Sequence, residues 1–185
     1  MGQIVNVYHG SPNKFDEFSF DFVGTASGTS GAGFGIYFTE VESEAFVYGE
    51  NCYHCILVLK SPLDNDKITL SKFDIFKLLS KLYDAEFNFY ENYGMQKVPV
   101  NSDSPIFNKI YDSLINSCTC DTEIIGSIVN SGCDVKLIME VLVEMGYTHT
   151  IDNVEPDDLI STHWIVYDLN AISIKEVYTL DTRNI

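Results

Sequence analysis

Basic residues are scarce in this chain. It carries 11 lysines and arginines against 27 aspartates and glutamates in 185 residues, which gives a formal net charge of −16 at pH 7. A surface this negative repels the phosphate backbone of nucleic acids and the headgroups of anionic lipids, so we expect no direct binding to nucleic acid or to a membrane. The same charge attracts basic protein surfaces, and it therefore favours a protein target with a basic surface.

Long apolar runs and a leader sequence are missing as well. No segment approaches the roughly 18 consecutive apolar residues that a membrane-spanning helix requires, and the first ten residues lack the basic and apolar pattern of a signal peptide. We therefore expect a cytoplasmic protein. With 45% hydrophobic residues the chain has enough apolar material for a core, and its length suits a single domain spanning residues 1–185.

Cysteine is present in an odd number, five, in a chain long enough to fold without disulfides, so we expect reduced thiols. Two pairs, Cys52 with Cys55 and Cys118 with Cys120, could together supply four thiolates to zinc. However, Cys55 opens the apolar run 56–59, and a strand of that kind usually buries its cysteine in the core. We therefore predict no metal site.

The apolar pattern changes twice along the chain. Alternating or continuous apolar runs predict strands over residues 4–8, 35–39 and 55–59 and, towards the other end, over 147–151, 164–167 and 172–174. Between them, apolar residues at helical spacing predict helices over 71–83, 104–114 and 134–145, and the polar segment 152–161 predicts a loop. This order indicates the α+β class, with a sheet built from both ends of the chain and a helical insertion over about residues 66–146.

Short motifs with chemical potential lie in the two strand-rich ends. His9-Gly10-Ser11 closes the first strand, and its glycine would let a ligand approach the backbone closely. The run 35–39, GIYFT, forms the next predicted strand, and Tyr48 follows its tyrosine, Tyr37, by eleven residues. Near the other end stands the segment 162–168, THWIVYD.

Together these motifs resemble the NAD-binding half of the ADP-ribosyltransferases related to diphtheria toxin and the poly-ADP-ribose polymerases, over about residues 4–60 and 146–178. The resemblance implies a split β-sheet core and NAD as the cosubstrate. It implies that the backbone of Gly10 pairs with the nicotinamide carboxamide and that Tyr37 and Tyr48 stack on the ring. It also implies that His9 bonds the hydroxyl of the nicotinamide ribose and that Ser11 assists near the adenosine.

The third motif departs from the family pattern. A glutamate usually stands just before its aromatic residue, where it stabilises the positive charge that develops on the ribose as nicotinamide leaves. Here His163 occupies that position before Trp164. A phage anti-CRISPR ADP-ribosyltransferase is similar over this stretch and has an aspartate six residues before the motif tryptophan, which corresponds to Asp158. We therefore predict that Asp158 supplies the carboxylate, with Glu155 and Asp157 as the alternatives.

The resemblance implies an NAD-dependent mono-ADP-ribosyltransferase whose catalytic set is Asp158, His9 and Tyr37. It would modify a protein target, a CRISPR surveillance complex being one example, and would act as a phage anti-CRISPR or anti-defence factor in the bacterial host cytoplasm, or as a bacterial toxin. Because His163 replaces the motif glutamate, a catalytically inactive protein that inhibits its target by binding through an acidic surface is the alternative. Hydrolysis of NAD without a protein acceptor is a third hypothesis.

Overall fold

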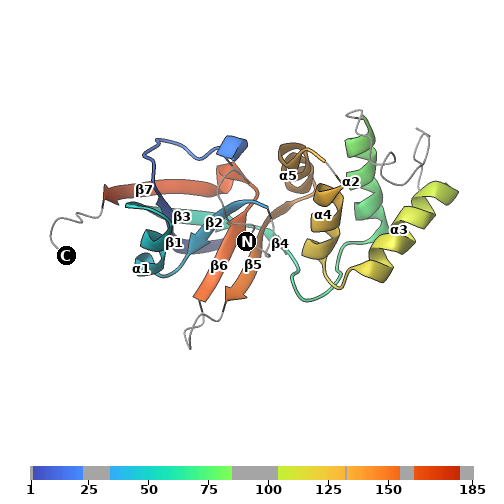
Figure 1. The fold of residues 1–185 in the computed structure, drawn as a ribbon, viewed down its shortest axis with the longest axis horizontal. Helices are drawn as coiled ribbons and strands as arrows, with labels where there is room; N and C mark the ends of the chain where they lie inside the picture. Colours follow the sequence, from blue (N-terminus) through green and yellow to red (C-terminus); the bar gives the residue numbers. More distant parts are fainter. Residues whose placement is uncertain (1, 23–33, 85–103, 132, 155–160, 180–185) are drawn as a thin grey trace.

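The computed structural model describes residues 2–22, 34–84, 104–131, 133–154 and 161–179. In this part of the chain a mixed seven-stranded sheet occupies one end of the molecule, and the helices that follow β4 gather at the other end (Figure 1). The fold is therefore of the α+β class, as the sequence predicts. None of the described helices is long and apolar enough to cross a membrane.

Both ends of the chain contribute strands to the sheet, which confirms the prediction from the apolar runs. The strands are β1 (Gln3–Ser11), β2 (Ile36–Thr39), β3 (Asn51–Leu59), β4 (Ser61–Leu63), β5 (Tyr147–Val154), β6 (Ser161–Val166) and β7 (Ile172–Thr179). Their order in the sheet is β4-β5-β6-β2-β1-β3-β7, with β4 and β5 parallel and the other neighbours antiparallel. The loop predicted over 152–161 is too long at both ends, because β5 continues to Val154 and β6 begins at Ser161.

The sheet consists of two ladders that meet at one point. On one side, β1 pairs with β3 continuously from Gln3 to Ser11, and on the other side β2 pairs with β6 along its whole length. Between the two ladders, Tyr8 of β1 and Thr39 of β2 form the one pair that joins β1 to β2. The described strands thus form the split sheet that the family resemblance implies.

Each face of the sheet has its own apolar core. On one face, Val7, Phe38, Leu57 and Trp164 pack together, so this core lies between the two ladders. On the opposite face, Ile165 of β6 packs against the helices, and so do Leu63 and the partly buried Tyr37. The alternation of side chains along a strand explains this division, because Phe38 and Tyr37 are neighbours in sequence and point to opposite faces.

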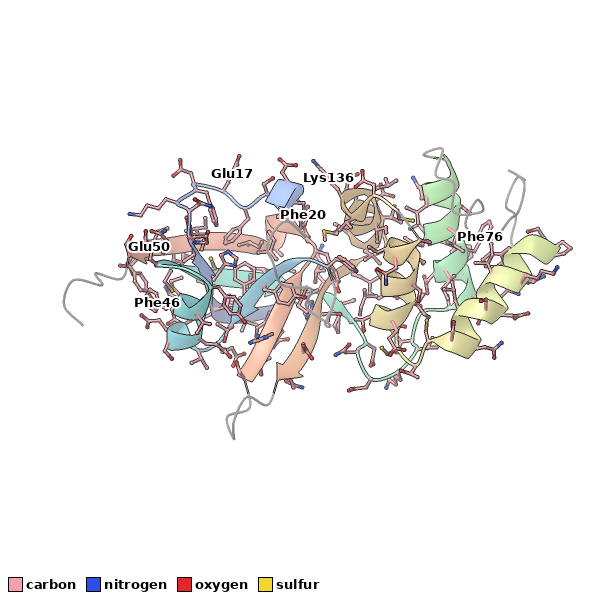
Figure 2. All side chains as sticks on the ribbon, viewed as in Figure 1. Glu17, Phe20, Phe46, Glu50, Phe76 and Lys136 are labelled. Atoms are coloured by element: carbon pink, nitrogen blue, oxygen red, sulfur yellow. The ribbon has the colours of Figure 1, made fainter. Side chains whose placement is uncertain are left out.

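The helical region contains α2 (Lys72–Asp84), α3 (Pro105–Ser117), α4 (Asp121–Asn130) and α5 (Val135–Glu144). Side chains cap the starts of two of these helices: the Ser104 hydroxyl accepts from the backbone of Phe107 at 3.1 Å, and Asp134 accepts from Lys136 at 2.9 Å. Phe76 of α2 packs against the Phe107 ring of α3, with ring centroids 5.3 Å apart (Figure 2). The sequence predicts three helices here, and α4 corrects that number.

A short helical segment that the sequence does not predict connects β2 to β3. It comprises α1 (Glu42–Ala45) and the 3-10 turn η2 (Phe46–Tyr48). Figure 1 shows α1 beside β1, and Figure 2 shows Phe46 at the end of the molecule opposite to Phe76. There the Phe46 ring contacts the ring of Tyr178 on β7, with centroids 6.0 Å apart. This segment carries Tyr48 to the end of β1.

Candidate functional site

The strands β1 and β2 separate immediately beyond the Tyr8–Thr39 pair. If their antiparallel ladder continued, Gly10 would stand opposite Tyr37, but no strand pair joins them. The edge of β1 that faces β2 is therefore without a ladder partner beyond Tyr8 among the described strands. Gly10 and Tyr37 lie on the same face of the sheet as that pair, because each is two residues away from a member of it. This is where the sequence predicts a bound nicotinamide.

His9 spans the separation between the two strands. Its Nδ1 lies 2.7 Å from the carbonyl oxygen of Tyr37, which can only accept, so Nδ1 carries the proton and Nε2 keeps its lone pair. The ring is enclosed by aromatic side chains, with centroids 5.1 to 6.1 Å away, from Phe15, Phe18, Phe38 and Tyr53. Burial lowers the pKa of His9, and the hydrogen bond to Tyr37 offsets only part of that effect. At neutral pH the imidazole is therefore uncharged, with Nε2 as an acceptor for a hydroxyl.

Gly10 is required by the approach of α1 and η2. A Cβ atom at this position would lie 1.7 Å from the carbonyl oxygen of Ala45, so no larger residue fits without moving the helix. The same hypothetical atom would lie 3.3 Å from Cβ of Tyr48. Tyr48 is thus attached directly over the end of β1, with 62% of its surface exposed.

Tyr37 and Ser11 are less exposed to solvent than Tyr48. Tyr37 is half-buried and packs at the edge of the helical core. Ser11 is buried, and its hydroxyl accepts from the backbone of Asn13 at 3.2 Å while its carbonyl accepts from the amide of Asn51 at 3.1 Å. Of the residues predicted to bind NAD, Gly10, Tyr37 and Tyr48 lie at the junction of β1 and β2, with Ser11 next to it. The His9 ring lies on the Phe38 face and reaches the junction through its hydrogen bond to the Tyr37 backbone.

A polar cluster that the sequence analysis missed adjoins this junction. Glu44 of α1 accepts hydrogen bonds on Oε2 from the hydroxyls of Thr39 and Ser161, the latter at 2.5 Å. Its other oxygen, Oε1, lies 3.3 Å from Nε2 of His163 without a well-aligned hydrogen bond between them. Glu44 stands seven residues after Tyr37 and four before Tyr48, and the helical spacing to Tyr48 was the signal that could have indicated it.

Hydrogen bonds set the ionisation of Glu44. Burial by itself would raise the pKa of this carboxyl, but the hydrogen bonds from Ser161 and Thr39, together with the neighbouring His163, outweigh it and hold the pKa below the usual value. The side chain retains about a fifth of its exposure. Glu44 is therefore a carboxylate at neutral pH.

The predicted carboxylates of the third motif are outside the described residues. Asp158, Asp157 and Glu155 all fall in 155–160, so their roles stay predictions. His163 itself is described: it pairs with Thr39 across β2 and β6, and its side chain is 13% exposed. All five cysteines are buried and free, and no group of three or more potential metal ligands occurs in the described ranges.

Comparison with protein families identifies the chain. The family "ADP-Ribosyltransferase in polyvalent proteins" matches residues 1–142. The chain belongs to this family. The matched region of this ADP-ribosyltransferase-family protein includes β1, β2, α1 and β3, which form the junction described above. The match ends before β5 and β6, so the strand of His163 lies beyond it.

A solved structure that resembles this ADP-ribosyltransferase-family chain is described as the crystal structure of an anti-CRISPR protein. It is 14% identical, with a TM-score of 0.35, and the likeness covers 93% of this chain and 94% of that one. No curated protein is significantly similar to the chain.

Proposed function

We propose that this protein is an NAD-dependent mono-ADP-ribosyltransferase that modifies a protein. The observation that carries the proposal is the separation of β1 and β2 beyond Tyr8, which leaves an unpaired strand edge at Gly10 between the positions of Tyr37 and Tyr48. Backbone N–H and C=O groups on such an edge are strong hydrogen-bonding groups without a ladder partner. They suit a planar carboxamide, which offers one donor group and one acceptor.

Each residue at the junction has a role in this proposal. Tyr37 and Tyr48 stack on the nicotinamide ring, which contributes on the order of 1–3 kcal/mol for each aromatic contact. His9, neutral and protonated on Nδ1, accepts from a ribose hydroxyl on Nε2. Ser11 assists near the adenosine, and Asp158 remains the carboxylate that the sequence predicts. NAD supplies the ADP-ribose to be transferred and nicotinamide as the leaving group.

The target is a protein with a basic surface. The net charge of −16 supports this part of the proposal, because it steers the encounter with such a surface and repels nucleic acids. The resemblance of the sequence to a phage anti-CRISPR ADP-ribosyltransferase makes a CRISPR surveillance complex the first target to test. We propose an anti-defence role in the cytoplasm of a bacterial host on the same ground.

The proposal is tested by incubating the protein with NAD labelled on the adenylate and with a bacterial lysate or purified surveillance complex. A labelled protein band together with free nicotinamide is the expected result. Free nicotinamide without a labelled band would replace transfer by NAD hydrolysis. No NAD binding at millimolar concentration in calorimetry would contradict the nicotinamide site itself.

One observation favours a second function. His163 stands where the family motif has a glutamate, and its Nε2 faces Glu44 at 3.3 Å. A protein that has lost its catalytic carboxylate could still inhibit its target by binding through the acidic surface. In that case the target binds with unchanged affinity whether or not NAD is present, and neither label nor nicotinamide appears.

A further inference from the structure

Glu44 places a negative charge beside the position that the motif glutamate has in the family. His163 occupies that position in the sequence, and the carboxylate oxygen Oε1 of Glu44 is 3.3 Å from its Nε2. The carboxylate therefore lies next to the residue at the motif position, and it belongs to α1 instead of β6. Two hydroxyls, from Thr39 on β2 and Ser161 on β6, hold the other oxygen.

The carboxylate lies on the side of the sheet where the nicotinamide site is proposed. Thr39, which donates to Glu44, is two residues from Tyr37 on β2, so the two side chains lie on the same face. Glu44 is also four residues before Tyr48 on the continuous α1–η2 segment, a spacing that brings side chains to one side of a helix. Both tyrosines of the site therefore come from the two elements that carry and anchor this carboxylate.

We propose that Glu44, in place of the Asp158 that the sequence predicts, supplies the catalytic carboxylate of this protein, with His163 as the residue that positions it. The inference rests on the proposed transferase function. In that reaction the bond between the nicotinamide nitrogen and the ribose carbon breaks, and its electron pair leaves with nicotinamide. The acceptor donates an electron pair to the same carbon and releases its proton to water. Glu44 stabilises the positive charge on the ribose between these two events.

The hydrogen-bonding arrangement explains why His163 is compatible with this role. An imidazole at the motif position cannot provide negative charge, but it can hold a neighbouring carboxylate in one orientation. Because the Thr39 and Ser161 hydroxyls both donate to Oε2, the remaining oxygen is the one that faces His163. A ligand that approaches the junction meets a carboxylate whose rotamer is already fixed, which lowers the reorganisation needed at the moment of reaction.

The test compares single-turnover release of nicotinamide by four proteins: wild type, Glu44→Gln, Glu50→Gln and the double variant Glu44→Gln with His163→Glu. Glutamine keeps an oxygen that accepts from Thr39 and Ser161, so only the charge is removed. We expect Glu44→Gln to slow release by roughly 100-fold to 1,000-fold, with NAD affinity within a few-fold of wild type. Glu50, which is exposed, is the matched control, and its variant should react at the wild-type rate.

The double variant separates a catalytic role from a structural one. It returns a carboxylate to the motif position on β6 while residue 44 carries none. We expect it to release nicotinamide at least ten times faster than Glu44→Gln. A merely structural Glu44 would give no such recovery. The double variant also answers the question if Glu44→Gln does not fold, because it keeps one carboxylate in the cluster; a folded double variant with no activity would overturn the proposal.

Asp158→Asn belongs in the same assay. If it abolishes release while Glu44→Gln reacts at the wild-type rate, the carboxylate is supplied by 155–160, the inference about Glu44 is wrong, and the transferase function stands. If wild type binds no NAD and releases no nicotinamide, the proposed function itself fails.

Discussion

Two carboxylates, Asp121 at the start of α4 and Glu44 beside the sheet, differ in the groups that donate hydrogen bonds to them. Asp121 of α4 is fully buried and accepts mainly from backbone N–H groups, those of Asp64, Thr69 and Leu70 at 2.7 to 3.2 Å, with the Thr69 hydroxyl as a fourth donor at 2.5 Å. Glu44 accepts from two side-chain hydroxyls and faces an imidazole. Backbone donors can only fix the course of the chain, whereas side-chain donors can change partner when a ligand arrives. The charge of Asp121 therefore organises the fold, and that of Glu44 remains available for chemistry.

The two regions also differ in the buried polar atoms that lack a hydrogen bond among the described residues. In the sheet these atoms are Nε2 of His149 and of His163, and in the helices the Oγ of Ser80. A serine hydroxyl stays neutral, but an imidazole can take up a proton when the pH falls. In the sheet, burial lowers the pKa of His149, so its imidazole stays neutral until the pH falls well below the usual range.

Replacement of Asp121 by alanine should have the largest effect on stability. Three backbone N–H groups would lose their acceptor in a buried site, and each unsatisfied group costs on the order of 1–3 kcal/mol. We expect the free energy of unfolding in urea to fall by about 3 kcal/mol or more. The control is Asp112→Ala on the exposed side of α3, which should stay within about 0.5 kcal/mol of wild type. Equal effects of the two variants would contradict the structural role of Asp121.

The helices show which parts of the fold can be predicted from local sequence. Apolar spacing and a capping residue are enough for α2, α3 and α5. In contrast, α4 has Gly126 near its middle, and its first residue, Asp121, is held by backbone groups more than 50 positions earlier. The three-residue strand β4 contains Pro62 and depends on parallel pairing with β5. Partners so distant in sequence leave no local pattern.

The candidate site was predictable for the same reason only in part. His9, Gly10, Tyr37 and Tyr48 belong to motifs with fixed spacing, so the sequence was enough to single them out. Glu44 lies in a four-residue helix that is too short to have a recognisable period, and its partner Ser161 is 117 positions away. Only the pairing of β2 with β6 brings Thr39, Ser161 and His163 around it.

Tyr48→Ala should weaken NAD binding while leaving stability nearly unchanged. The ring is 62% exposed, so its removal costs little packing, but one of the two stacking surfaces is lost. We expect a loss of about 1–3 kcal/mol in NAD binding free energy by calorimetry. Val47→Ala, at a neighbouring residue that is 78% exposed, is the control. If both variants bind NAD equally well, Tyr48 does not stack on the ring.

His149 should make the sheet sensitive to acid. Burial lowers its pKa to about 4, so the folded protein resists protonation that the unfolded chain accepts near pH 6.5. The contribution is complete above pH 6.5 and is lost as the pH falls towards 4. We expect His149→Gln to lose roughly 2 kcal/mol less stability than wild type between pH 7 and pH 5, measured by urea unfolding with the fluorescence of Trp164, whose ring is 5.6 Å away. Parallel pH profiles of the two proteins would show that another group is responsible.

Association with a basic target should become slower as salt rises, and this is the smallest of the expected effects. Between about 0.1 M and 1 M salt the Debye length falls from about 10 Å to about 3 Å, so a charge of −16 loses most of its steering, and the on-rate should fall by roughly tenfold.

Charge reversals then tell which region meets the target. Glu17 lies in the segment that packs Phe18 against His9, and Glu140 lies on α5; both side chains are exposed. Replacing either one by lysine changes the net charge from −16 to −14, because one negative charge becomes positive. If the target approaches the site in the sheet, Glu17→Lys slows association more than Glu140→Lys does, because only charges within about a Debye length of the contact act strongly on it. Equal slowing would mean that the overall charge and not the site guides the encounter, and an on-rate independent of salt would remove electrostatic steering altogether.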